Sequence, residues 1–458
     1  MENKSKNPLG SKKISTLLKE FAIPSIIAML VGSLYNVVDQ LFIGQNIGEL
    51  GNAATNVVYP LVPACIASAL LFGIGGASNF NLAMGRGEKD GAKYYIGNAA
   101  SMAFLIGSII AIFSEIACND MLVFFGASSN VYPLAESYLR ITAVGFPFLI
   151  FSSCATHIIR ADGSPKYSMK MNLTGAITNI ILDYIFIFIF GWGMFGAGLA
   201  TIIGQIISAV MGAVYLTRYK TIKLDIASFI PRLSVVISIA SLGAANCFNQ
   251  LAMMVLAIVL NKSLNYYGGL SPYGTDIPLA VSGVSLKCMQ IMMAFVIGLS
   301  QGLQPIASFN YGAKQYARVK EALFGALKTG AVISFLGFII FQVFPHQVIE
   351  MFGQGSEEYF EFGVRYIRIY YLFLFTYFIQ PIVSNFFSAI GKPIKGIFLS
   401  LTRQVIFFLP LLLLLPRFFG INGILYAGAM TDLIAASVCS IVGLKEITKP
   451  QYSKASDN

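Results

Sequence analysis

Long apolar runs dominate this sequence and restrict the folds that it can adopt. Runs of about 20 residues with almost no charge recur along the chain, and an α-helix of this length crosses the hydrocarbon core of a bilayer. Transmembrane β-strands are about half as long and alternate in polarity, so the pattern favours helices. Only 11% of the residues are charged, whereas a soluble domain needs about 25%. The sequence therefore predicts an all-α integral membrane protein.

The apolar runs divide into twelve predicted transmembrane helices. Several of them are longer than about 25 residues, so we expect these helices to tilt or to project beyond the bilayer. The predicted spans are residues 17–45, 55–84, 95–117, 133–158, 168–190, 196–218, 234–261, 278–305, 319–344, 359–388, 395–416 and 421–444.

Positive charges alternate from one connection to the next and predict the topology. Every connection from an even-numbered to an odd-numbered span is basic, as in the stretch with Arg86 and Lys89, and both chain ends are basic too. The opposite loops carry only Lys262 and Arg417 as cations. Because basic loops stay in the cytoplasm, we expect a multi-pass protein of the cell membrane with both termini cytoplasmic.

The two halves of the chain repeat each other. Three pairs of segments match in the same order along the chain: 138–141 with 366–369, 161–166 with 389–394, and 72–89 with 297–314. Both copies of each pair fall on the same side of the membrane, so the repeat is parallel. We expect two pseudo-symmetric six-helix bundles around a central cavity. The predicted parts are an N-terminal lobe (1–220), a cytoplasmic linker (221–233) and a C-terminal lobe (234–458).

Two carboxylates interrupt the apolar runs of the first half. Asp39 and Asp183 each lie about seven residues, or roughly 10 Å, inside the outer end of their spans. Asn179 precedes Asp183 by one helical turn on the same face, and Thr201 lies at a similar level. The position that matches Asp183 in the second half is Leu411, so the repeat alone does not explain the acid. Ionisable groups inside a membrane usually serve function, and we predict a cation site formed by Asp39, Asn179, Asp183 and Thr201.

The types of ligand leave the coupling ion open. Hard oxygen ligands suit an alkali cation such as Na⁺. Two close acids in a low-dielectric site cannot both ionise easily, so one of them can hold a proton. The same residues could serve Na⁺, H⁺ or both in competition. The sequence has no other metal motif and only two histidines, of which His157 is expected at the membrane interface, and we expect no cofactor.

Several stretches together resemble the multidrug and toxic compound extrusion (MATE) family, in its prokaryotic DinF-like branch. They are residues 35–39 with Pro24 earlier in the same helix, 179–183, 196–201 and 302–313. The resemblance covers nearly the whole chain and implies twelve helices in two lobes, cation-coupled export, and a cation site at the four residues named above. It also implies that Pro24, which removes a backbone hydrogen bond, is a hinge whose bending depends on the occupancy of that site.

Candidate substrate contacts come from both halves of the chain. Flexible methionines suit surfaces that accept ligands of many shapes. Lys287 either extends its ammonium group towards the interface or faces the cavity. The candidate cavity residues are Tyr35, Asn36, Gln40, Met253, Lys287, Gln290 and Met293.

Arg403 and Asp432 lie at comparable depth in the last two predicted spans. Opposite charges at the same level of one bundle form an ion pair more readily than they stay apart in an apolar medium. We predict a structural pair between them, with a role in the lumen of the cavity as the alternative.

These features favour a transporter and not an enzyme, since no nucleophile or catalytic pair accompanies the spans. The leading hypothesis is an antiporter that exports amphipathic, mostly cationic organic compounds and drugs in exchange for Na⁺ or H⁺. The alternative is a flippase or exporter of a lipid-linked or anionic metabolite, with Lys287 and Arg403 as basic groups. We expect a monomer in the lipid bilayer with drug-like small-molecule substrates. The net charge of +10 follows from topology, so we expect no nucleic-acid partner.

Overall fold

A computed structural model describes residues 7–125, 127–351 and 356–453, and within these ranges all regular structure is helical. Eleven helical segments are long and apolar enough to cross a membrane, and a helix pair bent by 40° can supply a twelfth span. The predicted all-α membrane fold is thus confirmed, with eleven to twelve candidate spans.

The first half of the chain contains six of these segments. They are α2 (Ile14–Asn46), α4 (Leu61–Arg86), α5 (Lys89–Ile116), α7 (Tyr132–Ala161), α8 (Pro165–Asp183) with the π-helical η1 (Tyr184–Ile189), and α9 (Gly193–Thr217). The second half contains α10 (Leu233–Gly269), α11 (Asp276–Gly312), α12 (Tyr316–Val343), α14 (Glu357–Tyr370) with α15 (Ile379–Ala389), α16 (Pro393–Leu401) with η4 (Thr402–Phe408) and α17 (Leu409–Phe419), and α18 (Ile421–Ile447). Short helices complete the order: α1 (Pro8–Ser11), α3 (Glu49–Val58), α6 (Cys118–Phe124), η2 (Ile226–Phe229), α13 (Pro345–Glu350), η3 (Leu374–Thr376) and α19 (Pro450–Ser453).

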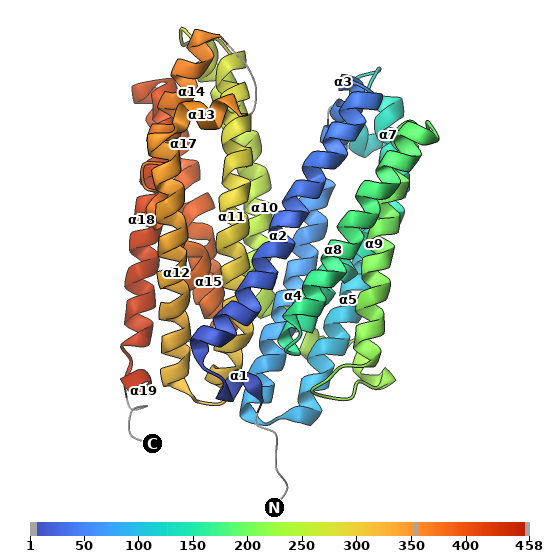
Figure 1. Ribbon diagram of the computed structural model, residues 1–458, viewed down its shortest axis with the longest axis vertical. Helices are drawn as coiled ribbons and strands as arrows, with labels where there is room; N and C mark the ends of the chain where they lie inside the picture. Colours follow the sequence, from blue (N-terminus) through green and yellow to red (C-terminus); the bar gives the residue numbers. More distant parts are fainter. Residues whose placement is uncertain (1–6, 126, 352–355, 454–458) are drawn as a thin grey trace, which may run out of the picture.

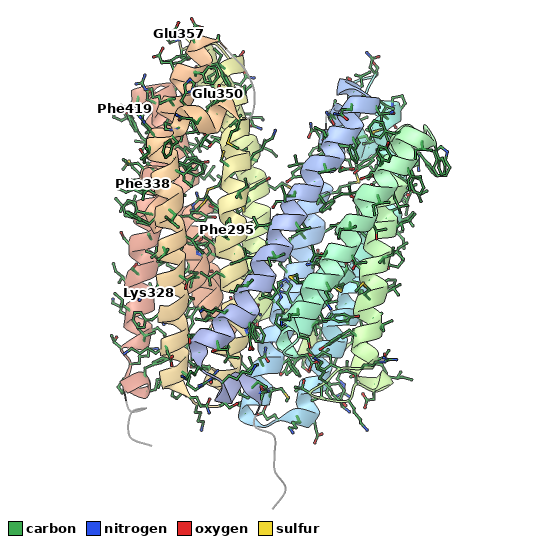
Figure 2. The ribbon with its side chains drawn as sticks, in the orientation of Figure 1. Phe295, Lys328, Phe338, Glu350, Glu357 and Phe419 are labelled. Carbon is green, nitrogen blue, oxygen red and sulfur yellow. The ribbon has the colours of Figure 1, made fainter. Side chains whose placement is uncertain are left out.

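The helices form two lobes that meet near the chain termini and diverge away from them (Figure 1). We call the end of the molecule that contains α1 and α19 the termini end, and the opposite end the far end. Glu350 and Glu357 lie at the far end of the C-terminal lobe (Figure 2). The lobes therefore lie closest together at the termini end, which is an arrangement that can open and close.

Helix α2 belongs to the hydrophobic cores of both lobes. Leu17 and Phe21, in its first half, are buried with residues of α11, α12 and α15, whereas Ile43, near its end, is buried with residues of α4 and α7. Helix α10 shows the reverse arrangement, because Ile239 is buried in the core of the N-terminal lobe and Leu256 packs within the C-terminal lobe. The packed cores therefore do not follow the predicted lobe boundaries at residues 220 and 234, because α2 and α10 each contribute to both cores.

Glycines bring the two lobes into direct backbone contact at the termini end. A Cβ atom on Gly243 would overlap the carbonyl group of Leu71, and one on Gly75 would overlap the carbonyl oxygen of Ile239. On the other side of the interface, a Cβ on Gly302 would lie 2.7 Å from the Cα of Ala22. Small residues allow membrane helices to approach closely and gain van der Waals contact. We call this glycine-lined contact the seam.

The turns that end matching helices show how far the predicted repeat holds. Gly163 and Gly391, at equivalent positions, both adopt positive φ (77° and 75°), and a helix beginning with proline follows each. The other pair differs by two residues. Gly87 has φ 83°, but its counterpart in the structure is Lys314, with φ 59°, and not the aligned Gly312, which remains helical. The sequence alignment of 72–89 with 297–314 is therefore shifted at its end.

The tenth predicted span, 359–388, is not one continuous helix. Helix α14 ends at Tyr370, a short 3₁₀ turn follows, and α15 resumes at Ile379 with a 40° bend between the two parts. Pro381 lies in the first turn of α15, where a missing N–H group breaks no helical bond. The break could not be predicted from the sequence, because the apolar run continues through it.

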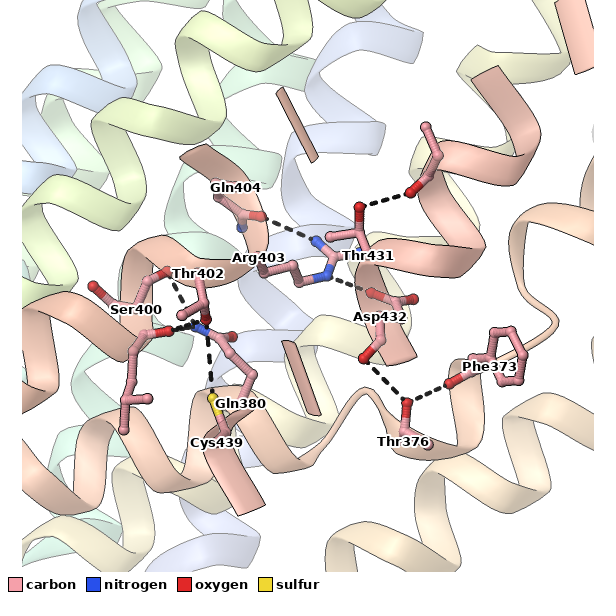
Figure 3. A network of polar contacts seen from close by, with 12 residues as sticks. Phe373, Thr376, Gln380, Ser400, Thr402, Arg403, Gln404, Thr431, Asp432 and Cys439 are labelled. Carbon is pink, nitrogen blue, oxygen red and sulfur yellow. Dashed lines mark hydrogen bonds and ion pairs between the residues drawn. The ribbon is translucent and has the colours of Figure 1, made fainter. Parts of the chain in front are cut away.

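Arg403 and Asp432 form an ion pair inside the C-terminal lobe (Figure 3). Arg403 Nε lies 2.6 Å from Asp432 Oδ1, Asp432 is only 3% exposed, and the guanidinium lies over the ring of Tyr377. Arg403 belongs to the π-helical η4, which connects α16 to α17. The pair links the eleventh and twelfth predicted spans, as a structural role requires.

Adding one methyl group to the seam should weaken it. In Gly243→Ala the new Cβ meets rigid backbone, and such overpacking typically costs about 1–3 kcal/mol. We expect a lower melting temperature of the purified protein than in the wild type. Gly283→Ala is the matched control, because nothing lies within 4 Å of a Cβ there; its stability should equal or exceed that of the wild type. Equal melting temperatures for the two variants would show that the seam is not tightly packed.

The structural role of the Arg403–Asp432 pair can be tested by a double-mutant cycle. Arg403→Met or Asp432→Leu alone leaves an uncompensated buried charge, which typically costs about 3–5 kcal/mol. The double variant should recover much of the lost stability and membrane yield. Additive losses in the double variant would mean that the two side chains act independently.

Candidate cation site

The acidic residues of the N-terminal lobe lie on two neighbouring elements. Asp39 belongs to the second half of α2, and Asp183 is the last residue of α8, directly before the π-helical η1. Phe42 packs edge-on against Phe188, with ring centroids 5.5 Å apart, and so holds α2 beside η1. Asp39 is 7% exposed and Asp183 is fully buried. Each carboxyl group lies within the electrostatic range of the other, as the sequence analysis expected.

Asn179 and Thr201 complete the polar cluster. Glycines at the α8–α9 contact let these helices approach, because a Cβ on Gly204 would lie 2.7 Å from the carbonyl oxygen of Gly175. At this short distance Asn179 Nδ2 donates a hydrogen bond of 3.4 Å to Thr201 Oγ1. The structure therefore brings together all four residues of the predicted site.

The chemistry of the cluster lies in its unpaired oxygens. Asp39 Oδ1, Asn179 Oδ1 and both carboxyl oxygens of Asp183 are buried and receive no hydrogen bond from the described residues. Buried polar atoms without partners are costly, and four such oxygens in one place fit a bound cation or a proton. Among residues 7–125, 127–351 and 356–453, no group of three or more His, Cys, Asp and Glu side chains could hold a metal ion. The carboxylate, amide and hydroxyl oxygens of the cluster are hard ligands, of the kind that suits an alkali cation.

Tyr138 is a neighbour of the site that the sequence analysis did not include. This residue of α7 lies close to Asp39, Asp183 and Thr201, and Tyr35 of α2 lies close to both acids. A helical wheel of the fourth span could have placed Tyr138 on the inner face. The helical wheel could not have shown which other helices pack against that face.

The predicted substrate contacts occupy three helices and differ in exposure. Asn36 is exposed and donates to the carbonyl of Gly32 in its own helix, whereas Gln40 Oε1 accepts from Thr55 Oγ1 at 3.0 Å. Lys287 and Gln290 are exposed on α11. Tyr35, Met253 and Met293 are partly buried on α2, α10 and α11. Their joint role in a cavity remains a prediction.

Pro24 lies inside α2, in the half that packs on the C-terminal lobe. The helix continues through it, and Ser25, the next residue, donates from its hydroxyl to the carbonyl of Phe21. Proline removes one backbone hydrogen bond from a helix and lowers its resistance to bending. The predicted hinge therefore lies near the seam, 15 residues before Asp39 of the same helix.

His157, expected at the membrane interface, is buried between the lobes instead. It is 6% exposed and neighbours Arg160, which is 4% exposed. The expected position of His157 rested only on its distance from the end of the predicted span. That distance could not predict that the C-terminal lobe covers the end of α7.

Comparisons with known proteins agree with the fold. The MatE family model matches residues 24–185 and 246–413, one segment in each half of the chain. The multidrug export protein MepA of Staphylococcus saprophyticus is 23% identical over 93% of this chain and 92% of its own. A FAD transporter of Shewanella oneidensis is 25% identical over 99% of both chains.

A solved structure shows the same architecture. A multidrug resistance MATE family transporter of the MOP superfamily, in an outward-facing conformation, superposes with a TM-score of 0.89 at 22% sequence identity. The superposition covers 98% of this chain and 99% of the other. The family match across both halves identifies this chain as a member of the MatE family of multi-pass membrane transporters.

Proposed function

We propose that this protein is a cation-coupled antiporter of the cell membrane that exports amphipathic organic compounds. The observation that carries the proposal is the group of buried oxygens at Asp39, Asn179 and Asp183 that have no hydrogen-bond donor among the described residues. Binding of Na⁺ or H⁺ there would relieve the cost of keeping them unpaired. The coupling ion would then be the one whose gradient drives export.

The basic loops support a cytoplasmic termini end, because cations concentrate in cytoplasmic connections. In that orientation the seam closes the cytoplasmic side and the diverging lobes face outwards. A cation from outside would reach the Asp39–Asp183 pair in this state. Release of the exported compound outwards and release of the cation inwards would then require the lobes to part at the seam.

Helix α2 can couple the two events, since one helix carries both the acid and the hinge. Asp39 lies in the half that packs in the N-terminal lobe, and Pro24 in the half that packs on the C-terminal lobe. A cation bound at Asp39 would favour one curvature of α2, and that curvature would change the contact between lobes. Such coupling is reciprocal, so the exported compound must alter cation affinity by the same factor.

A second candidate function is the export of an anionic or lipid-linked metabolite. Its support is the FAD transporter of Shewanella oneidensis, which is 25% identical to this chain over 99% of both proteins. The two candidates share the fold and the cation site and differ in the charge of the cargo. The MepA relatives, which are multidrug export proteins, support the first candidate.

Removing either acid should abolish coupling. We expect Asp39→Asn and Asp183→Asn to reduce gradient-driven dye export from proteoliposomes by about tenfold or more, because the site loses the charge that distinguishes its occupied and empty states. Imposed Na⁺ and H⁺ gradients, applied separately, identify the ion. The exposed Asp90→Asn is the matched control. Wild-type export by both site variants would disprove the assignment.

Removing the hinge should slow the cycle without unfolding the protein. Pro24→Ala restores a backbone N–H and straightens α2, so we expect a several-fold lower export rate at an unchanged melting temperature. Pro133→Ala in the first turn of α7 is the control, because the N–H group that alanine introduces there has no partner within the helix. Normal export by Pro24→Ala would exclude bending at this position as a required step.

A further inference from the structure

A buried arginine without a carboxylate partner lies between the lobes at the termini end. Arg160, in the last turn of α7, is 4% exposed. None of the ion pairs among the described residues includes it. The nearest acid in sequence, Asp162, is already occupied, since it accepts hydrogen bonds from Tyr215 Oη and from the backbone of Lys220 and Thr221.

Neutral groups from several helices hold the guanidinium instead. Arg160 Nη1 donates to Gln301 Oε1 at 2.7 Å and to Ser25 Oγ at 3.0 Å, and Nε donates to the carbonyl of Thr156 at 3.2 Å. Its Nη2 has only a long contact of 3.5 Å with His157 Nδ1. Arginine offers five N–H donors, so the Nη2 side has donor capacity to spare.

The surrounding pocket contains a second unused donor. The pocket lies between α4, α7 and α11 and is lined by Asn81, His157, Arg160, Gln301 and Gln304 among others. Asn81 is 1% exposed, and its Nδ2 has no acceptor among the described residues. None of the described residues that line the pocket carries a carboxylate. The unused donors of Arg160 and Asn81 therefore lie beside one full positive charge.

A purely mechanical contact between lobes would not need this charge. Neutral pairs already cross the same interface: Gln304 Nε2 donates to Ser78 Oγ at 2.9 Å, and Asn79 Nδ2 donates to the carbonyl of Ser238 at 3.0 Å. Burying a charge costs far more than burying an amide unless an opposite charge meets it. The extra cost is explained if an anion meets Arg160 at another stage of the cycle.

We propose that the Arg160 pocket binds the anionic group, a phosphate or carboxylate, of an amphipathic compound that enters from the termini side. This inference rests on the proposed export function and specifies the class of its cargo. In the present conformation the pocket is too narrow to admit even a water molecule, so the ligand reaches Arg160 only when the seam opens. Ser25 and Gln301 then release the guanidinium at the modest cost of neutral hydrogen bonds, and they take it back when the cargo leaves.

Flavin mononucleotide (FMN) and riboflavin provide a matched pair of probes, because they differ only by one phosphate group. Binding of each is measured by flavin fluorescence with the full-length protein in nanodiscs, where both faces are accessible and no ion gradient exists. Charge-assisted hydrogen bonds to phosphate are strong, so wild type should bind FMN roughly 10- to 100-fold more tightly than riboflavin. Arg160→Gln should bind both equally.

Further variants keep the test decisive if Arg160→Gln does not fold. Gln301→Glu places a carboxylate against the guanidinium as an internal counter-ion, so it should fold and should lose the preference for FMN. If it merely locked the seam, it would weaken FMN and riboflavin equally and leave their ratio unchanged, which would contradict the proposal. Arg160→Lys should retain part of the preference. Arg140→Gln is the control, since Arg140 is exposed on the same helix and pairs with Glu115 and Glu136, and it should behave as wild type.

The remaining outcomes separate this inference from its alternatives and from the proposed function. Equal binding of FMN and riboflavin to the wild type, or no binding of either, would leave Arg160 as a polar contact only and overturn the inference. Full displacement of FMN by an equal concentration of inorganic phosphate would identify a site for free anions and also overturn it. Because no gradient is used, failure here leaves the Asp39–Asp183 coupling intact, and failure of the coupling experiment leaves the flavin result standing.

Discussion

The close contact of helix backbones at the seam determines how this molecule can move. Where Gly75, Gly243 and Gly302 lie against the opposite lobe, no side chain separates the backbones. Dispersion contacts fall off steeply with distance, so a small separation at the seam loses most of the attraction at once. The contact is therefore either formed or broken, and the far end can open widely while the seam remains closed. Polar groups such as Asn79 and Gln304 cross the same interface and give it a defined register.

Unpaired polar atoms occur in the N-terminal lobe and between the lobes, and each location suits a different ligand charge. Oxygens without donors surround Asp39 and Asp183, whereas N–H groups with spare capacity surround Arg160. In the C-terminal lobe, by contrast, Arg403 and Asp432 largely satisfy each other. A buried charge that is paired within the protein has little reason to bind anything else. The Asp39–Asp183 cluster and the Arg160 pocket are therefore places where ligands of opposite sign are expected.

Much of this organisation could be predicted from the sequence. The lengths of the apolar runs predicted the helices, and the charges of the loops predicted their topology. Helical periodicity placed Asn179 beside Asp183. These predictions succeeded because each depends on residues that lie close together in the chain. Contacts between lobes were harder to predict. Leu17 and Ile43 are equally apolar, so nothing local shows that they are buried in different lobes. Arg160 looked like an ordinary basic residue at the end of a span, and its burial depends on Gln301, which lies far away in the chain. The break after Tyr370 was hidden because 3₁₀ and α-helical turns have similar apolar composition.

The membership of α2 in both cores has a mechanical consequence. With 33 residues the helix is about 50 Å long, and its two halves are anchored to bodies that must move relative to each other. The lobes therefore cannot rotate independently of each other. Any rotation of one lobe relative to the other must bend α2, because each half of the helix is packed into a different lobe. The compliance of the helix, set largely by the segment between the two anchorages, would limit both the amplitude of the swing and the elastic energy returned on the way back.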